Sequence, residues 1–179
     1  MKRKALFSLF LLVPAPSVGV LFGMVWFPGT ALGQGVFLAA KVWILLLPAV
    51  WHFAVERGAP GRGAARPGGL RAGAWSGLAI GAVIVAAAFI LGPRFIDVRA
   101  FRAAMAEVGL GSPAAYLAMA VYWTGVNSLL EEYVWRWFAV GQCARLMRPA
   151  AAVGVGAAAF ALHHVLALQV YLSWPLALL

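Results

Sequence analysis

Two adjacent carboxylates and an arginine stand inside the apolar stretch NSLLEEYVWRWF, which runs from residue 127 to 138. The carboxylates are Glu131 and Glu132, and the arginine is Arg136. A positioned carboxylate can take a proton from water and so act as a general base. Charged side chains within membrane segments are costly, and they normally face a bundle interior or a water-filled cavity. This stretch is therefore the first candidate for an active site.

The polar residues of this stretch fall on one half of a helix, because each residue of an α-helix turns by about 100°. They are Thr124, Asn127, Ser128, Glu131, Glu132 and Arg136. Glu132 and Arg136 are four residues apart, so we expect an ion pair within the bilayer. Glu131 points about 100° away from that pair, which places the two carboxyls in different environments, as acid–base chemistry needs. The alternative for Glu132 and Arg136 is a structural pair that ties the helix to its neighbours.

The second candidate group lies near the C-terminus, where Phe160 and His164 are four residues apart and His163 precedes His164. Glu131 lies 14 residues before Arg145, and His164 lies 16 residues after Arg148. At 1.5 Å per residue these separations are about 21 Å and about 24 Å. Antiparallel helices would therefore place Glu131 and His164 at similar depth. A hydrogen-bonded packing role is the alternative for either histidine.

The elements that must position these groups are membrane helices. The chain has 179 residues, of which 64% are hydrophobic and 11% are charged. Five apolar stretches are each close to the roughly 20 residues that span a bilayer. They cover about 5–27, 35–54, 73–92, 113–144 and the segment from 149 onward. The predicted fold is all-α, a multi-pass transmembrane bundle of five long spans plus a short C-terminal apolar segment, in one integral-membrane domain over 1–179.

Basic residues set the expected orientation. The net charge of +9 is concentrated in connecting loops, which indicates membrane topology and no nucleic-acid partner. A cytoplasmic N-terminus places nine of the fourteen basic residues inside, in the N-terminal segment, the 57–71 loop and the 145–148 turn. The segment 93–112 is expected to contain an amphipathic helix on the membrane surface. A secretory signal peptide is the alternative interpretation of the N-terminus.

The two groups together resemble a known family. EEYVWR matches the E-E-x-x-x-R motif of the CAAX-protease and bacteriocin-processing (CPBP) family of intramembrane endopeptidases, and FALHH matches its F-x-x-x-H motif. The resemblance covers about residues 113–168. It implies a glutamate-type intramembrane protease, described earlier as a metalloprotease. It assigns Glu131 as the base that activates water and His164 as a holder of that water, with Glu132 and Arg136 in support.

The sequence departs from this family at its C-terminal end. Family members usually carry a later H-x-x-x-N or H-x-x-x-D motif that stabilises the oxyanion, and no histidine follows His164 here. Either the sequence stops short of the natural end or another residue takes the role. The candidates are His163, Asn127 and His52, in that order. A required zinc ion is not expected, because no H-E-x-x-H spacing exists, although Glu131, Glu132, His163 and His164 could supply ligands.

The expected function is cleavage of a peptide or protein client in or near the membrane. A pro-peptide, a bacteriocin leader or a C-terminal sorting tail is the expected substrate, and the bacterial inner membrane is the expected location. The main alternative is a non-catalytic relative that acts as an immunity, scaffold or peptide-binding protein. A small transporter is a third hypothesis, but its charges would be spread over several helices.

Overall fold

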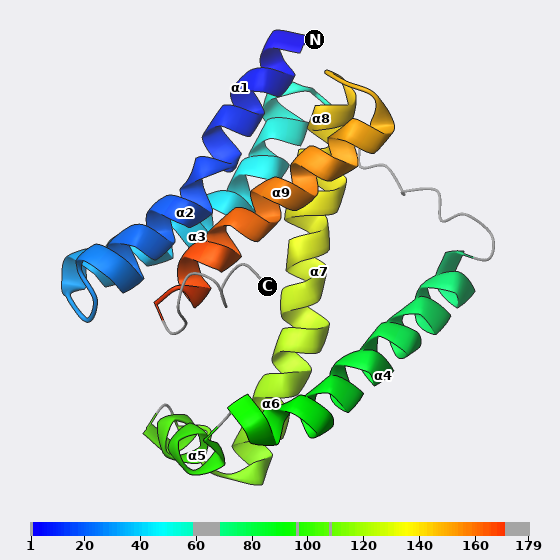
Figure 1. Ribbon diagram of the computed structural model, residues 1–179. Coiled ribbons are helices and arrows are strands. Elements are labelled where there is room, and N and C mark those ends of the chain that lie inside the picture. The colour runs from blue at the N-terminus through cyan, green and yellow to red at the C-terminus, as the bar shows by residue number, and fades with distance from the viewer. Residues whose placement is uncertain (1, 59–68, 96, 108, 171–179) are drawn as a thin grey trace. The chain divides into compact units, whose positions relative to one another are not determined.

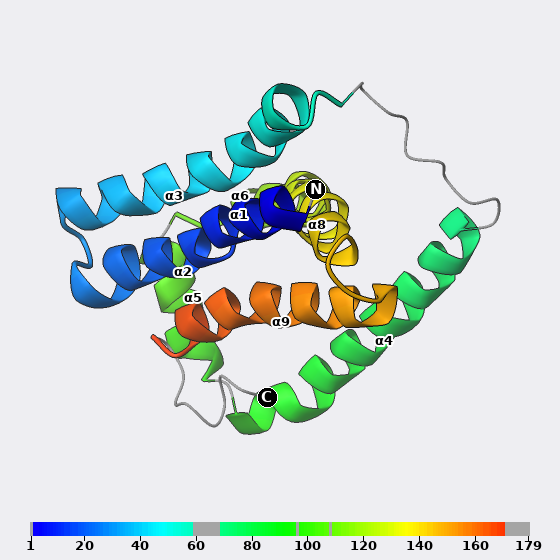
Figure 2. The same cartoon turned by 90° about the horizontal axis from the view of Figure 1, so that it is seen from above.

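The computed structural model describes residues 2–58, 69–95, 97–107 and 109–170, and these are all-α (Figures 1 and 2). The chain divides into two compact units, one formed by residues 1–59 and 126–179 and the other by residues 60–125. The prediction of one integral-membrane domain over 1–179 stays a prediction.

The first unit begins with two helical stretches joined by a tight turn. The first stretch comprises α1 (Lys2–Leu12), α2 (Pro14–Val20) and η1 (Leu21–Trp26), and the second comprises α3 (Ala31–Val50) and η2 (Trp51–Val55). The η segments are wound as π-helix. Gly29 has a φ of 72°, which glycine adopts without steric cost, so it allows the chain to reverse. The side chain of Thr30 then caps α3 by accepting a hydrogen bond from the Gly33 amide at 3.1 Å.

Small residues let these two stretches pack closely. A Cβ added at Gly19 would lie 2.9 Å from Cβ of Ala40, and one added at Gly23 would lie 2.9 Å from Cβ of Phe37. Both distances are shorter than side chains tolerate, so glycine is needed at each crossing. Close contact between membrane helices through small residues replaces the hydrophobic driving force that lipid cannot provide.

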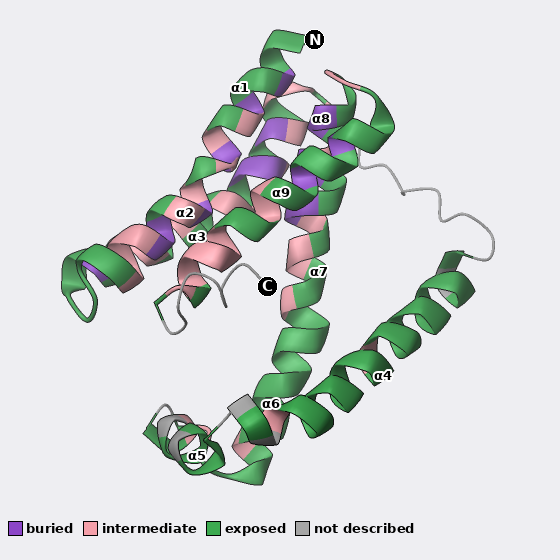
Figure 3. Cartoon of the chain, in the orientation of Figure 1, coloured by how far each residue is buried: buried purple, intermediate pink, exposed green. Residues whose placement is uncertain are grey.

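The rest of the first unit comes from the C-terminal part of the chain. It contains α7 (Ser128–Glu131), η4 (Glu132–Val140), α8 (Gly141–Ala144) and α9 (Pro149–Leu168). The buried residues gather where these helices meet α1 and α3 (Figure 3). The core of the unit consists of Leu12, Leu47, Trp51, Val134, Trp135, Phe138 and Ala139. The apolar side of η4 is therefore the centre of the unit.

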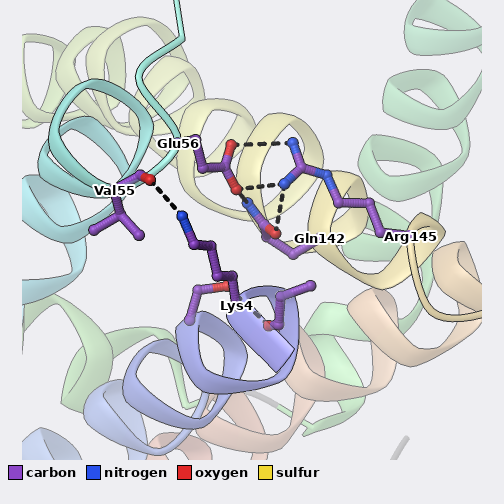
Figure 4. Close-up of polar contacts among 7 residues, drawn as sticks. Lys4, Val55, Glu56, Gln142 and Arg145 are labelled. Carbon is purple, nitrogen blue, oxygen red and sulfur yellow. Dashed lines mark hydrogen bonds and ion pairs between the residues drawn. The ribbon is translucent and has the colours of Figure 1, made fainter. Parts of the chain in front are cut away.

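A polar clasp closes one end of this unit (Figure 4). Glu56 accepts hydrogen bonds from Gln142 Nε2 at 2.8 Å and from both terminal nitrogens of Arg145, of which Nη2 lies at 3.0 Å. Lys4 Nζ donates to the Val55 carbonyl at 2.9 Å. The N-terminal segment, the end of η2 and the turn after α8 therefore meet at one end of the unit. The side of the membrane on which the three basic segments lie stays a prediction.

The second unit contains α4 (Gly69–Phe95) and α5 (Val98–Glu107), followed by α6 (Pro113–Val121). The next helical segment, η3 (Tyr122–Asn127), lies at the boundary between the units. Ser112 caps α6 by accepting a hydrogen bond from the Ala115 amide at 3.2 Å, and Pro113 occupies the first turn, as predicted. Most of the basic 55–72 loop lies outside the described residues.

The prediction of five long spans is wrong in number, because four helices of the described chain are long and apolar enough to cross a membrane. They are Lys2–Trp26, Ala31–Val55, Arg71–Gly92 and Pro149–Leu168. Residues 113–144 are helical almost throughout, but Asn127, Glu131, Glu132 and Arg136 lower their apolar content. The adjacent carboxylates Glu131 and Glu132 therefore lie on a long helical stretch whose composition is not that of a simple span, whereas His164 lies on the candidate span Pro149–Leu168. The predicted C-terminal apolar segment lies mostly outside the described residues.

The clasp predicts a measurable contribution to stability. Arg145→Ala removes both hydrogen bonds of the guanidinium to the largely buried carboxylate of Glu56. The free energy of unfolding should fall by about 1–3 kcal/mol. The loss of stability should be near the lower end of this range, because the Arg145 side chain is 39% exposed and water screens the ion pair. Arg148→Ala, at a nearby exposed arginine, should change stability by less than about 0.5 kcal/mol. Thermal unfolding in detergent measures both, and equal stabilities of the two variants would contradict a stabilising clasp.

The same clasp should weaken in acid. Burial alone would raise the pKa of Glu56, but hydrogen bonds from Arg145 and Gln142 and the charge of Arg145 outweigh it and lower that pKa. The clasp therefore stabilises the folded state fully above the pKa of an unfolded glutamate, about 4.3, and loses this contribution as the pH falls below it. The wild type should lose more stability than Arg145→Ala between pH 6 and pH 3.

Candidate active site

The first part of the site lies at the junction of α7 and η4. Glu131 is half-buried, and its Oε1 accepts a hydrogen bond of 2.8 Å from Nδ2 of Asn127, which is also half-buried. The two residues are one helical turn apart, so the local winding alone is enough to bring them together. The amide fixes one carboxylate oxygen of Glu131 and leaves the other available. The sequence placed both residues on one face but did not anticipate this pairing.

The predicted pair of Glu132 and Arg136 is confirmed, with Nε of Arg136 3.1 Å from Oε2 of Glu132. The expected burial of this pair is wrong, because the side chain of Glu132 is 53% exposed and that of Arg136 is 78% exposed. The physical reason lies in the direction of packing. The core is formed by the other side of η4, through Val134, Trp135 and Phe138.

The winding of this helix also differs from the one expected. Residues 122–127 and 132–140 are wound as π-helix, so a spacing of 100° per residue holds only for part of the polar stripe. Wide π turns are often found at functional sites. Here they also occur in η1 and η2, away from both sequence motifs, so the winding alone does not mark the site.

The second part of the site lies on α9, where His164 is half-buried. Nδ1 of His164 is 3.0 Å from the carbonyl oxygen of Phe160, and the two rings lie 4.4 Å apart. A carbonyl can only accept a hydrogen bond, so Nδ1 must carry the proton. In the neutral imidazole Nε2 is then an acceptor, which can receive a hydrogen bond from water. Phe160 therefore fixes the tautomer of His164 as well as its position.

Trp135 connects the two parts of the site. Its ring stacks on His163, with centroids 5.4 Å apart and planes 10° apart, and it meets the Phe160 ring edge-on at 5.7 Å. The rings of His163 and His164 are 4.1 Å apart. No role was predicted for Trp135 from the sequence. Its position one turn after Glu131, on a helix expected to face a histidine helix, was the signal that could have identified it.

Small residues on α9 allow this contact. A Cβ at Gly156 would lie 2.5 Å from Cγ2 of Val140, and Ala152 is completely buried. Gly156 therefore lets η4 come close to α9 at this point. The two helices that carry the motifs therefore pack directly against each other.

The structure does not join the carboxylates to the histidines directly. Among the described hydrogen bonds, none links Glu131 or Glu132 to His163 or His164. The expected similar depth of Glu131 and His164 stays a prediction. Polar groups that are too far apart for a direct hydrogen bond often act together through a bridging water.

His52, another candidate for the site, contacts a different part of the helical stretch that carries Glu131. His52 contacts Trp137 edge-on, with ring centroids 5.4 Å apart, six residues beyond Glu131 on the same helical stretch. Within the described part of the chain, no three His, Cys, Asp or Glu side chains gather to form a metal site. The donor set of the described residues does not fit a zinc centre.

Comparison with known families also points to the C-terminal segment that carries the two motifs. A family model described as "Type II CAAX prenyl endopeptidase Rce1-like" matches residues 113–179. The match starts at the residue predicted from the two motifs and extends beyond them. The C-terminal part of the chain is therefore similar to the Rce1-like domain of the CPBP group. No curated protein and no solved structure matches the chain.

The exposed pair predicts weak coupling. Arg136→Ala and the double variant Glu132→Ala/Arg136→Ala should unfold within about 1 kcal/mol of each other, because exposed pairs of this spacing contribute about 0.3–0.5 kcal/mol. Thermal unfolding in detergent, with Glu132→Ala to complete the cycle, measures the coupling. A single variant that is less stable than the double variant by about 3–5 kcal/mol would show a buried pair instead.

The contact with Phe160 predicts the tautomer of His164. In histidine-labelled protein at pH 8, the neutral ring should carry its proton on Nδ1. Long-range ¹⁵N–¹H correlation spectra distinguish the two tautomers, and the variants His163→Gln and His52→Gln assign the signals. A proton on Nε2 of His164 would contradict the hydrogen bond to the Phe160 carbonyl.

Proposed function

We propose that this protein is an intramembrane endopeptidase in which Glu131 activates water. The observation that carries the proposal is the direct packing of the E-E-x-x-x-R helix on the F-x-x-x-H helix through Trp135, inside a segment that matches the Rce1-like model. Similarity to this domain family supports proteolysis as the reaction class. Activity, cleavage site and residue roles are part of the proposal.

In the proposed mechanism, Asn127 holds Oε1 of Glu131, and Oε2 takes a proton from water. The resulting hydroxide attacks the carbonyl carbon of the scissile peptide bond, and the proton passes from Glu131 to the leaving amine. His164 helps to hold the water through Nε2, which its contact with Phe160 leaves free to accept. Arg136 pairs with Glu132, so Glu131 is the carboxylate without an ion-pair partner in the described residues.

The oxyanion of the tetrahedral intermediate needs a hydrogen-bond donor. His163 is the first candidate, because its ring lies against Trp135 and His164. Asn127 is the second, since its amide carries two protons and one is used by Glu131. His52 is the weakest candidate, because its ring contacts Trp137, which lies six residues beyond Glu131 on the same helical stretch as Glu131.

The proposed substrate is a peptide or protein segment at the membrane, such as a pro-peptide, a bacteriocin leader or a C-terminal sorting tail. The four candidate spans support placement in a membrane. A cytoplasmic N-terminus in a bacterial inner membrane is part of the same proposal. The meeting of Lys4, Val55 and Arg145 at one end of the first unit supports it, because most basic residues then share the cytoplasmic side.

This orientation has a direct test. In a Cys143→Ala background, cysteines at Arg57 and Arg148 should resist an impermeant thiol reagent in intact cells, whereas a cysteine at Ala103 should react. In the proposed orientation α4 crosses the membrane between Arg57 and Ala103, and the helical stretch 113–144 returns the chain across the membrane before Arg148. Reaction at Arg57 and Arg148, with protection at Ala103, would reverse the orientation.

A non-catalytic peptide-binding protein is the second candidate function. The observation in its favour is that no described hydrogen bond joins Glu131 to a histidine. Such a protein would hold a client segment without cleaving it, so the two functions differ in the products formed.

Glu131→Gln should abolish proteolysis and leave the fold intact. The glutamine oxygen can still accept the hydrogen bond of Asn127, but it cannot take a proton from water, so the rate should fall at least about 100-fold. Proteoliposomes with a library of quenched fluorescent peptides measure cleavage, and thermal unfolding reports folding.

Glu107→Gln, on α5 and away from both motifs, is the matched control. It should cleave at the wild-type rate. Equal cleavage by the Glu131→Gln variant would exclude Glu131 as the base. Peptide binding without any cleavage by the wild type would favour the non-catalytic function.

A further inference from the structure

Helix α5 has two chemically different faces. Val98, Phe101 and Met105 share one face, while Arg99 and Glu107 lie on the other, with Arg102 at the boundary between them. Val98 is 50% exposed and Phe101 is 48% exposed, so nothing in the described protein fully covers the apolar face. An amphipathic helix of this kind, with basic residues beside apolar ones, is typical of the membrane–water interface.

The connection to α4 confines α5 to that interface. The apolar span of α4 ends at Gly92, and α5 begins at Val98, only six residues later. Six residues extend at most about 20 Å, so α5 must start close to the boundary that α4 crosses. Asp97 accepts a hydrogen bond from the Arg99 amide at 2.9 Å, which starts the new helix at that point.

A pocket of about 410 Å³ lies between α5 and the beginning of α6. Its lining includes Phe101, Arg102, Met105, Leu110, Ser112 and Tyr116. The walls are mainly apolar, and Arg102 is the only charged side chain among the lining residues. A volume of several hundred cubic ångströms is typical of sites for small molecules. The pocket thus combines one cation with an apolar wall at the level of the lipid headgroups.

We propose that this pocket binds an anionic phospholipid, with its phosphate at Arg102 and the start of an acyl chain along Phe101 and Met105. A guanidinium can make two parallel hydrogen bonds to a phosphate, which a single neutral donor cannot do. The apolar wall favours a lipid over a free anion, because a free anion would leave Phe101 and Met105 in contact with water. The pocket is lined by none of the residues of the candidate active site, and the proposal does not depend on the activity of that site.

The depth of α5 can be measured with spin labels on the full chain in nanodiscs that contain phosphatidylglycerol. In the Cys143→Ala background, a label at Phe101→Cys should be accessible to oxygen and protected from a water-soluble nickel complex. A label at Ala103→Cys, on the opposite face, should show the reverse. Equal access of the nickel complex to both labels would place α5 in water and overturn the proposal.

Lipid selectivity can be measured by native mass spectrometry of the full chain with phosphatidylglycerol and phosphatidylcholine. Arg102→Gln should weaken phosphatidylglycerol binding about fivefold, as expected for one interfacial arginine, and leave phosphatidylcholine binding unchanged. Arg99→Gln is the matched control, because Arg99 does not line the pocket, and it should retain most of the binding. Unchanged binding in Arg102→Gln, or an equal loss in both variants, would exclude a specific site at Arg102.

Discussion

The contact of Trp135 with Phe160 and His163 is the interaction on which the candidate site depends. It lies between the two helices that carry the sequence motifs, and no charge or hydrogen bond in the described chain replaces it there. Aromatic rings prefer edge-on and offset contacts of this kind, which restrict orientation as well as distance. The absence of a side chain at Gly156 makes the contact possible, because any Cβ there would collide with Val140.

The second constraint is the cost of placing charge on a helix of a membrane protein. Partners on the same helical stretch stabilise both carboxylates, since Asn127 donates a hydrogen bond to Glu131 and Arg136 pairs with Glu132. Local pairs leave the opposite side of η4 free for the core. The same polar residues make this stretch less apolar than the four candidate spans. The side chains proposed for catalysis therefore make this segment less suited to be a simple span.

The prediction of an all-α membrane protein succeeded because apolar length alone indicates a span. The two i,i+4 contacts of the site, Glu132 with Arg136 and His164 with Phe160, were also accessible from spacing, because both partners lie on one helix. The clasp of Glu56 with Arg145 was not, since 89 residues separate its partners. The burial of Glu132 was mispredicted because a helical wheel shows which residues share a face but not which face the core covers.

The sequence by itself determined the motifs, the Rce1-like segment, most span boundaries and the local pairs. Each of these depends on composition or on residues within one helical turn. Only the tertiary structure decided that Trp135 meets His163, that Gly156 admits η4, and that Glu56 closes the bundle with Arg145. These contacts join distant parts of the chain, and their existence depends on how helices cross. The angle at which two helices cross depends on the side-chain shapes of both helix surfaces. One segment of sequence describes only one of these surfaces.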